Sequence, residues 1–144
     1  MYYMGNSNGS DKGGQPFVEN IKKVAMQNND FRRAIWVGDH LQMTVMEIPP
    51  QGEIGLEMHD TADQFIRVEN GTVLIRTGDS QEDMDMEYIM SEGMGAFIPA
   101  GTWHNVMNTG RTPVKVSSLY APPNHPKGTV QRTKEEAEVV EKAY

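Results

Sequence analysis

The chain consists mainly of short runs of β-branched and aromatic residues, which turn residues interrupt at short intervals. Four of these runs are QFIRVE (64–69), TVLIRT (72–77), GAFIPA (95–100) and PVKVSSLY (113–120). Turn-forming pairs such as Asn70-Gly71 lie between them. Many short strands separated by such turns are typical of sandwiches and barrels, so the pattern predicts an all-β domain.

Both ends of the chain depart from this pattern. Residues 1–15 are mostly Gly, Ser, Asn and Asp with little to bury, which predicts a flexible N-terminal arm. Residues 16–30 mix helical and strand spacings, and we expect a short strand followed by a helical turn. Near the C-terminus, Thr133 and Glu136 form a capping-box pattern, which predicts a short helix from about residue 133.

Length and charge exclude several classes of protein. A chain of 144 residues fits one domain, and we expect that domain over residues 16–144. The formal net charge of −7 offers no basic field to attract nucleic acid or anionic lipid. No apolar run approaches the roughly 20 residues of a membrane span, and no signal-peptide pattern opens the chain. We therefore expect a cytoplasmic protein without nucleic-acid or membrane partners.

The first candidate site residues are a carboxylate and an imidazole in an extended stretch. Glu57 and His59 are two positions apart, so their side chains project to the same side. Gln64 begins the next strand in phase with the apolar Ile66 and Val68, so we expect its side chain to face the core as well. Because the chain has no Cys, metal binding would depend on such His and carboxylate side chains.

A second imidazole follows a rigid turn. The Pro99-Ala100-Gly101 turn joins two short strands and places His104 early on the second strand. Val106 shares the face of His104, so we expect that imidazole to point inward.

These two segments resemble the paired motifs of the cupin superfamily, whose members are small β-barrels that hold one metal ion. The second cupin motif contains Gly, Pro, Gly, His and Asn at fixed intervals. The chain has Gly93, Pro99, Gly101, His104 and Asn108 at those intervals. The resemblance implies a double-stranded β-helix, a jelly-roll-like barrel. More narrowly, the chain resembles short bacterial cupins often labelled mannose-6-phosphate isomerase-like, a label that establishes no isomerase activity.

The first motif is altered at two ligand positions. It reads Gly52, Glu57, His59, Gln64 and Gly71, so a Glu stands at the first His position and a Gln at the Glu position. The resemblance implies that Glu57, His59, Gln64 and His104 hold a divalent ion, for which Mn, Fe, Ni and Zn are all acceptable. Gln64 has two alternative roles, as a group that hydrogen-bonds substrate or as one that orients His59.

Three residues are candidates for catalysis. Glu57 is the best-placed general base if it does not bind the ion. Tyr120 lies in the inward phase of its strand and can serve as a donor or general acid. His125, between prolines after the last barrel strand, can fold over the mouth of the barrel.

We therefore expect a metal-binding barrel that takes a small oxygenated metabolite, such as a sugar derivative or an organic acid, with isomerase or dioxygenase chemistry. The alternative is a barrel that binds or senses a metabolite without turnover. Phe65 and Arg67, opposite Gln64, have no evident partner within one barrel, so we also expect a homodimer.

Overall fold

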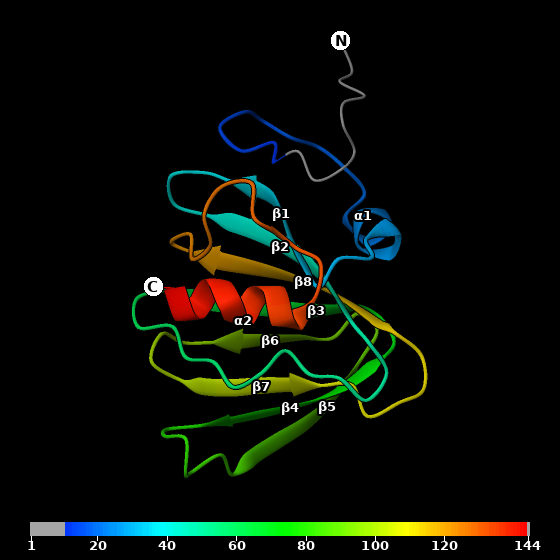
Figure 1. The fold of residues 1–144 in the computed structure, drawn as a ribbon, viewed down its shortest axis with the longest axis vertical. Coiled ribbons are helices and arrows are strands. Elements are labelled where there is room, and N and C mark those ends of the chain that lie inside the picture. The colour runs from blue at the N-terminus through cyan, green and yellow to red at the C-terminus, as the bar shows by residue number, and fades with distance from the viewer. Residues whose placement is uncertain (1–10, 144) are drawn as a thin grey trace.

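The computed structural model describes residues 11–143, with side chains up to residue 139. It contains strands β1 (Arg32–Val37), β2 (Gln42–Ile48), β3 (Asp63–Asn70), β4 (Thr72–Gly78), β5 (Met86–Ser91), β6 (Gly95–Ile98), β7 (Trp103–Met107), β8 (Val114–Ala121) and β9 (Val130–Gln131), and helices α1 (Ile21–Gln27) and α2 (Lys134–Ala143). The predicted all-β class and the short C-terminal helix are confirmed (Figure 1).

The strands form two antiparallel sheets that enclose one core. The larger sheet has the order β6-β3-β8-β2-β1-β9, and the smaller has the order β5-β4-β7. Ile66 and Val116 from the larger sheet pack with Ile75 and Val106 from the smaller one in a single apolar cluster. Alternation along the strands therefore turns apolar side chains into the space between the sheets, where their burial stabilises the fold.

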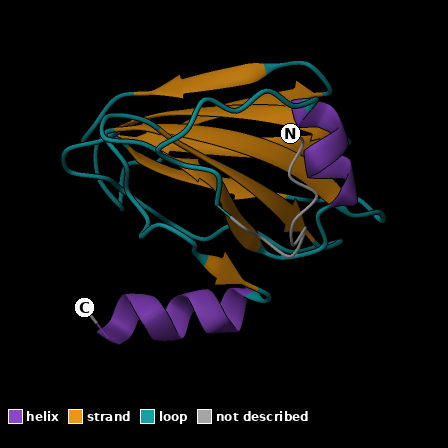
Figure 2. Cartoon of the chain, turned by 90° about the horizontal axis from the view of Figure 1, so that it is seen from above, coloured by secondary structure: helices purple, strands orange, loops and turns teal. Residues whose placement is uncertain are grey.

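Both helices lie outside the strand layers (Figure 2). Helix α1 contributes Ile21, Val24 and Ala25 to an apolar cluster with Ile35 and Val45 of the larger sheet. It therefore covers part of the outer face of that sheet.

Half of the capping box expected at helix α2 is present, because Thr133 caps the helix while the Glu136 carboxylate reaches Arg132, one residue before the cap. The backbone N–H of Glu136 donates to the Thr133 hydroxyl at 3.1 Å, and the Glu136 carboxylate accepts from the Arg132 backbone N–H at 3.3 Å. These contacts satisfy backbone donors at the start of the helix and favour its beginning at Lys134.

The expected strand within residues 16–30 was wrong. In this stretch the described chain forms α1 and no strand. The side chain of Asn20 accepts a hydrogen bond from the Lys23 backbone N–H at 3.0 Å, so it caps the helix at its first turn. The apolar residues that follow then pack at helical spacing, and this tertiary contact decides between the two spacings that the sequence allowed.

The expected flexible arm falls partly on residues 1–10, which lie outside the described residues. Residues 11–15 make defined contacts that this expectation did not include. The Asp11 carboxylate accepts hydrogen bonds from the backbone N–H groups of Gly13, Val37 and Gly128. The indole N–H of Trp36 donates to the Gln15 carbonyl at 2.8 Å. This segment is therefore held against β1.

Phe65 and Arg67 have partners within the same chain. The ring of Phe65 lies 4.5 Å from that of Phe97, centroid to centroid, and Arg67 Nε lies 3.6 Å from the carboxylate of the buried Glu69. The reason we gave for a homodimer is therefore weaker, although Phe97 itself is 83% exposed. The homodimer stays a prediction.

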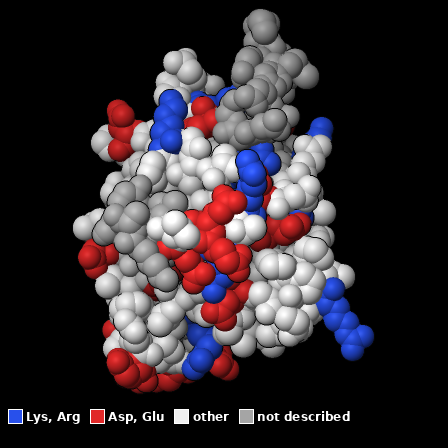
Figure 3. Space-filling model, in the orientation of Figure 1, with Lys and Arg blue, Asp and Glu red and all other residues white. Residues whose placement is uncertain are grey.

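Within the described residues, no helix is long and apolar enough to cross a membrane. On the face shown in Figure 3, Asp and Glu side chains gather across the middle, and Lys and Arg are scattered among and around them. The described residues on this face form no extended basic patch.

Asn108, the last residue of the second motif, provides a test of this architecture. Its side-chain amide donates to the carbonyls of Ile48, Pro49 and Thr112, and its oxygen accepts from the Gly110 N–H. We expect Asn108→Ala to lower the free energy of unfolding by about 2–4 kcal/mol, because it leaves several buried groups unpaired. Urea unfolding measures the loss.

Asn105→Ala is the matched control. Asn105 makes one such bond, in which its side-chain oxygen accepts from the Gly55 N–H at 2.9 Å, so we expect a loss of only about 1 kcal/mol. Equal losses in the two variants would contradict this assignment.

Candidate metal centre

The site begins with a backbone bridge between two segments that are distant in sequence. Glu57 N–H donates to the His104 carbonyl, and His104 N–H donates to the Glu57 carbonyl, both at 2.9 Å. Residues that face each other in such an antiparallel bridge project their side chains to the same side. The bridge therefore places the Glu57 carboxylate beside the His104 imidazole, on strand β7. Since His59 follows Glu57 by two residues, its side chain reaches the same space.

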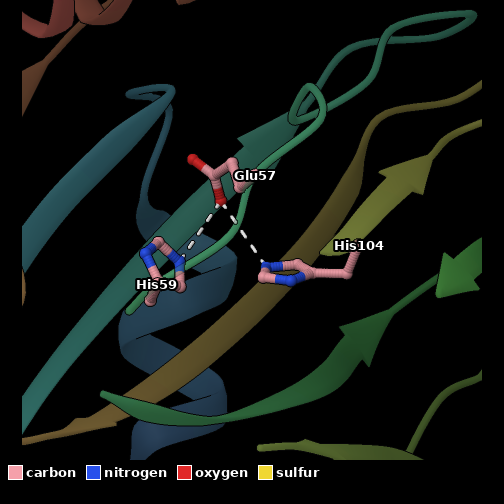
Figure 4. Close-up of side chains that lie close together, drawn as sticks. All are labelled: Glu57, His59 and His104. Atoms are coloured by element: carbon pink, nitrogen blue, oxygen red, sulfur yellow. Dashed lines mark ion pairs between the residues drawn. The ribbon is translucent and has the colours of Figure 1, made fainter. Parts of the chain in front are cut away.

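Three ligand atoms converge at this point (Figure 4). Glu57 Oε1 lies 3.7 Å from His59 Nε2 and 3.8 Å from His104 Nε2. All three atoms lie within 4.8 Å of one another. Ligand atoms bound to one tetrahedral ion at about 2.1 Å are roughly 3.4 Å apart, so the two imidazoles and the carboxylate would draw closer together around a shared ion.

The two imidazoles each have a ring nitrogen that is suited to bind a cation. His59 Nε2 and His104 Nε2 are buried, and neither has a hydrogen-bond partner in the described part of the chain. His104 Nδ1 lies 3.1 Å from the Thr102 carbonyl, which can only accept, so the proton of the neutral ring lies on Nδ1. The lone pair of His104 Nε2 is then directed toward Glu57. A divalent ion would satisfy both orphaned nitrogens.

His59 is held in the neutral form that a metal requires. Burial lowers the pKa of His59 to about 4, with further contributions from His104 and Arg32, while the neighbouring Gln64 opposes the shift. A neutral imidazole presents a lone pair at neutral pH, so no proton has to be displaced when a metal binds.

Gln64 lies at the edge of this cluster. Its side-chain amide donates to the Ser118 hydroxyl at 3.4 Å, whereas its buried oxygen makes no hydrogen bond of good geometry among the described residues and lies near His59. The oxygen is thus available to an ion, a substrate or His59. The three roles expected for Gln64 all stay open as predictions.

The structure brings Tyr120 and His125 to the same end of the barrel. The ring centroid of Tyr120 lies 5.6 Å from that of His59 and 5.2 Å from that of His125. Gln42 holds the loop that carries His125, because it accepts from the backbone N–H groups of Asn124 and His125 and donates to the His125 carbonyl. His125 therefore lies over the site without entering the group of three ligand atoms.

Burial determines the protonation of both residues. It raises the pKa of Tyr120 to about 12, with a smaller contribution from Glu57, so the phenol keeps its proton. Burial also lowers the pKa of His125 to about 3, together with the positive charge of Arg32 and with His59, so that imidazole is neutral. Around neutral pH, the site thus contains a phenol that can donate a hydrogen bond and an imidazole that can accept one.

Sequence reasoning missed Arg32. This residue of β1 is 1% exposed, and its guanidinium donates to Glu57 Oε2 at 3.3 Å and to Gln131 Oε1 at 2.8 Å. Its Nε has no partner among the described residues. The available signal was the pair Arg32-Arg33: strand alternation turns one of two adjacent arginines inward, but it does not say which.

A cavity of about 530 Å³ lies next to the cluster. Its lining is partly apolar and partly polar, and consists of Leu56, Glu57, Met58, His59, Trp103, Asn124, His125, Pro126, Thr129, Val130 and Gln131. This volume suits a small molecule, and two of the three ligand residues line it.

The low histidine pKa values predict how stability depends on pH in the metal-free protein. Because the pKa values of His59 and His125 fall from 6.5 to about 4 and about 3 on folding, the unfolded chain binds more protons below pH 6.5. The contribution of the two histidines to the free energy of unfolding is complete above pH 6.5. It is lost as the pH falls toward their pKa values in the folded protein. We expect the free energy of unfolding to fall by about 1 kcal/mol per pH unit for each histidine between pH 6.5 and 5.

Urea unfolding in EDTA across this range measures the slope, and His125→Asn should make it shallower. His40→Asn, which removes an exposed imidazole that does not line the cavity, is the matched control. A His125→Asn variant with the parental slope would contradict the assignment.

Comparison with known proteins gives the family. Residues 44–120 match the Cupin_2 family model, described as "Cupin domain". The uncharacterized protein YrkC of Bacillus subtilis is 47% identical over 131 residues, which cover 91% of this chain and 70% of that protein. The uncharacterized protein L612 of Acanthamoeba polyphaga mimivirus is 36% identical, over 81% of this chain and 71% of its own length.

Among solved structures, that of BH2720 from Bacillus halodurans has a TM-score of 0.89 and 48% sequence identity, and the match covers 90% of this chain and 98% of that one. The predicted double-stranded β-helix is confirmed, and the chain belongs to the cupin family.

Proposed function

We propose that this cupin binds a divalent metal ion through Glu57, His59 and His104, and that its cavity takes a small oxygenated metabolite for isomerase or oxygenase chemistry. The observation that carries the proposal is the convergence of three ligand atoms, two of which are buried imidazole nitrogens without a hydrogen bond among the described residues. Buried polar atoms are seldom left unpaired, and a shared ion pairs all three.

Two imidazoles and one carboxylate are a ligand set that suits Fe, Mn, Ni and Zn. Such a set leaves coordination positions open, and a bound ion would supply Lewis-acid chemistry and a template for an oxygen-bearing ligand there. Gln64 is a candidate for an additional ligand, through the oxygen that has no partner in the described structure.

The surrounding side chains would position the metabolite and move protons. Tyr120 keeps its proton at neutral pH because its pKa is about 12, so its hydroxyl can donate to an oxygen that gains negative charge. His125 is neutral and lines the cavity, which suits a hydrogen-bond acceptor, whereas a pKa of about 3 makes it a weak general base. Where Glu57 does not bind the ion, its Oε1 is free to act as the base instead.

A second candidate function is a barrel that binds a metabolite without a metal and without turnover. The observation that favours it is the ion pair between Arg32 and Glu57, with 3.3 Å between Nη2 and Oε2. The guanidinium neutralises the carboxylate that would otherwise attract a cation.

Metal content separates the two functions. We expect near-stoichiometric metal in the purified untagged protein, or in protein loaded with Mn, Fe, Ni or Zn, as measured by elemental mass spectrometry. Glu57→Gln and His104→Ala should each lower metal content about tenfold or more, because each removes one of three ligands. Circular dichroism establishes that the variants are folded.

Glu53→Gln is the matched control. Glu53 lies in the same segment, 44% exposed, and pairs with Lys134 outside the cluster, so its loss should leave metal content unchanged. A parent protein that cannot be loaded with any of the four metals would favour the metal-free barrel.

A further inference from the structure

The buried arginine beside the metal cluster changes the charge that a ligand of this site would meet. Arg32 is 1% exposed, and its guanidinium lies against Glu57 Oε2, the carboxylate oxygen that faces away from the two imidazoles. A guanidinium stays protonated at all ordinary pH values, so its charge cannot be titrated away. In the absence of an ion, the charges of Arg32 and Glu57 therefore sum to zero.

A bound divalent ion would leave this end of the barrel with excess positive charge. His59 and His104 coordinate metals as neutral imidazoles, so they add no negative charge. Among the described residues that line the cavity, Glu57 is the only carboxylate, and Arg32 already offsets it. No described residue that lines the cavity therefore balances the two charges of the ion, and an unbalanced charge in a largely buried site is unfavourable.

We propose that the metabolite of this site is a carboxylate anion, and that the anion and the metal ion bind cooperatively because Arg32 has cancelled the charge of Glu57. This inference rests on the proposed metal site and specifies its ligand. The carboxylate would occupy open positions on the ion and supply the missing negative charge, while the rest of the molecule lies in the cavity against Leu56, Met58 and Trp103. Arg32 is a positioning residue here, since it acts through Glu57.

Manganese and lactate test the proposal, with lactamide as an uncharged analogue of nearly the same shape. The dissociation constant for Mn²⁺ is measured by calorimetry in buffer alone, with lactate and with lactamide. We expect lactate to tighten Mn²⁺ binding about tenfold or more, and Mn²⁺ to tighten lactate binding by the same factor, since coupling between sites is reciprocal. Lactamide should have no such effect.

We expect Arg32→Gln to weaken the coupling between Mn²⁺ and lactate. Without the guanidinium, Glu57 keeps its full charge for the ion, so Mn²⁺ alone should bind more tightly than in the parent. The gain from lactate should then fall below about threefold. Arg32→Lys, which keeps the charge, should retain the coupling.

Arg76→Gln is the matched control for the loss of one positive charge. Arg76 lies on β4, does not line the cavity and pairs with Glu87 at 3.1 Å, so this variant should couple Mn²⁺ and lactate as the parent does.

Each outcome decides between the proposals. Binding of Mn²⁺ that is equally tight with lactate, with lactamide and in buffer would overturn the carboxylate inference and leave the metal site standing. Full coupling in Arg32→Gln would overturn the role given to Arg32. No Mn²⁺ binding under any condition would overturn the metal site and this inference together. If Arg32→Gln fails to fold, the comparison of lactate with lactamide in the parent still tests the inference.

Discussion

Two backbone hydrogen bonds between Glu57 and His104 hold the candidate site together. The segment from Glu53 to His59 is not a regular strand, and it follows β7 through isolated bridges. The Ile54 N–H donates to the Val106 carbonyl, and the Gly101 N–H donates to the His59 carbonyl, so both ends of the segment are also fixed. This pairing brings the carboxylate of one motif to the imidazole of the other. The cluster, its cavity and the proposed chemistry all depend on it.

The end of the barrel that carries the candidate site is polar, unlike the apolar core between the two sheets. Seven buried side-chain atoms in the described structure lack a hydrogen bond of good geometry, and six belong to this end, namely Arg32 Nε, Thr44 Oγ1, His59 Nε2, Gln64 Oε1, His104 Nε2 and Tyr120 OH. Several of them lie near one another, since Tyr120 interacts with Thr44 and Arg32, and His59 with Gln64. Each unpaired group costs free energy of folding, and apolar side chains would pack there without that cost. Such a concentration of unpaired groups at one cavity is typical of a site whose partners arrive with a ligand. Under the proposed function, stability at this end of the barrel is given up for binding.

Strand alternation and motif spacing account for what could be predicted. They identify the all-β class and the inward face of His104, and they place Glu57 and His59 on one side, because these features depend on residues close in sequence. They could not decide which of Arg32 and Arg33 turns inward, since that choice depends on a bulge between Ala34 and Trp36 and on pairing with distant strands. The contacts of residues 11–15 were missed for the same reason, because their partners lie on β1 and near Gly128.

Anomalous diffraction from crystals of the Mn²⁺-loaded protein tests the central claim most directly, since it locates the ion without reference to activity. The account predicts one strong peak per chain, about 2.0–2.3 Å from Glu57 Oε1, His59 Nε2 and His104 Nε2. An anomalous peak at any other position would contradict this account. The absence of a peak between the two imidazoles at saturating Mn²⁺, with Glu57 still paired to Arg32, would also contradict it.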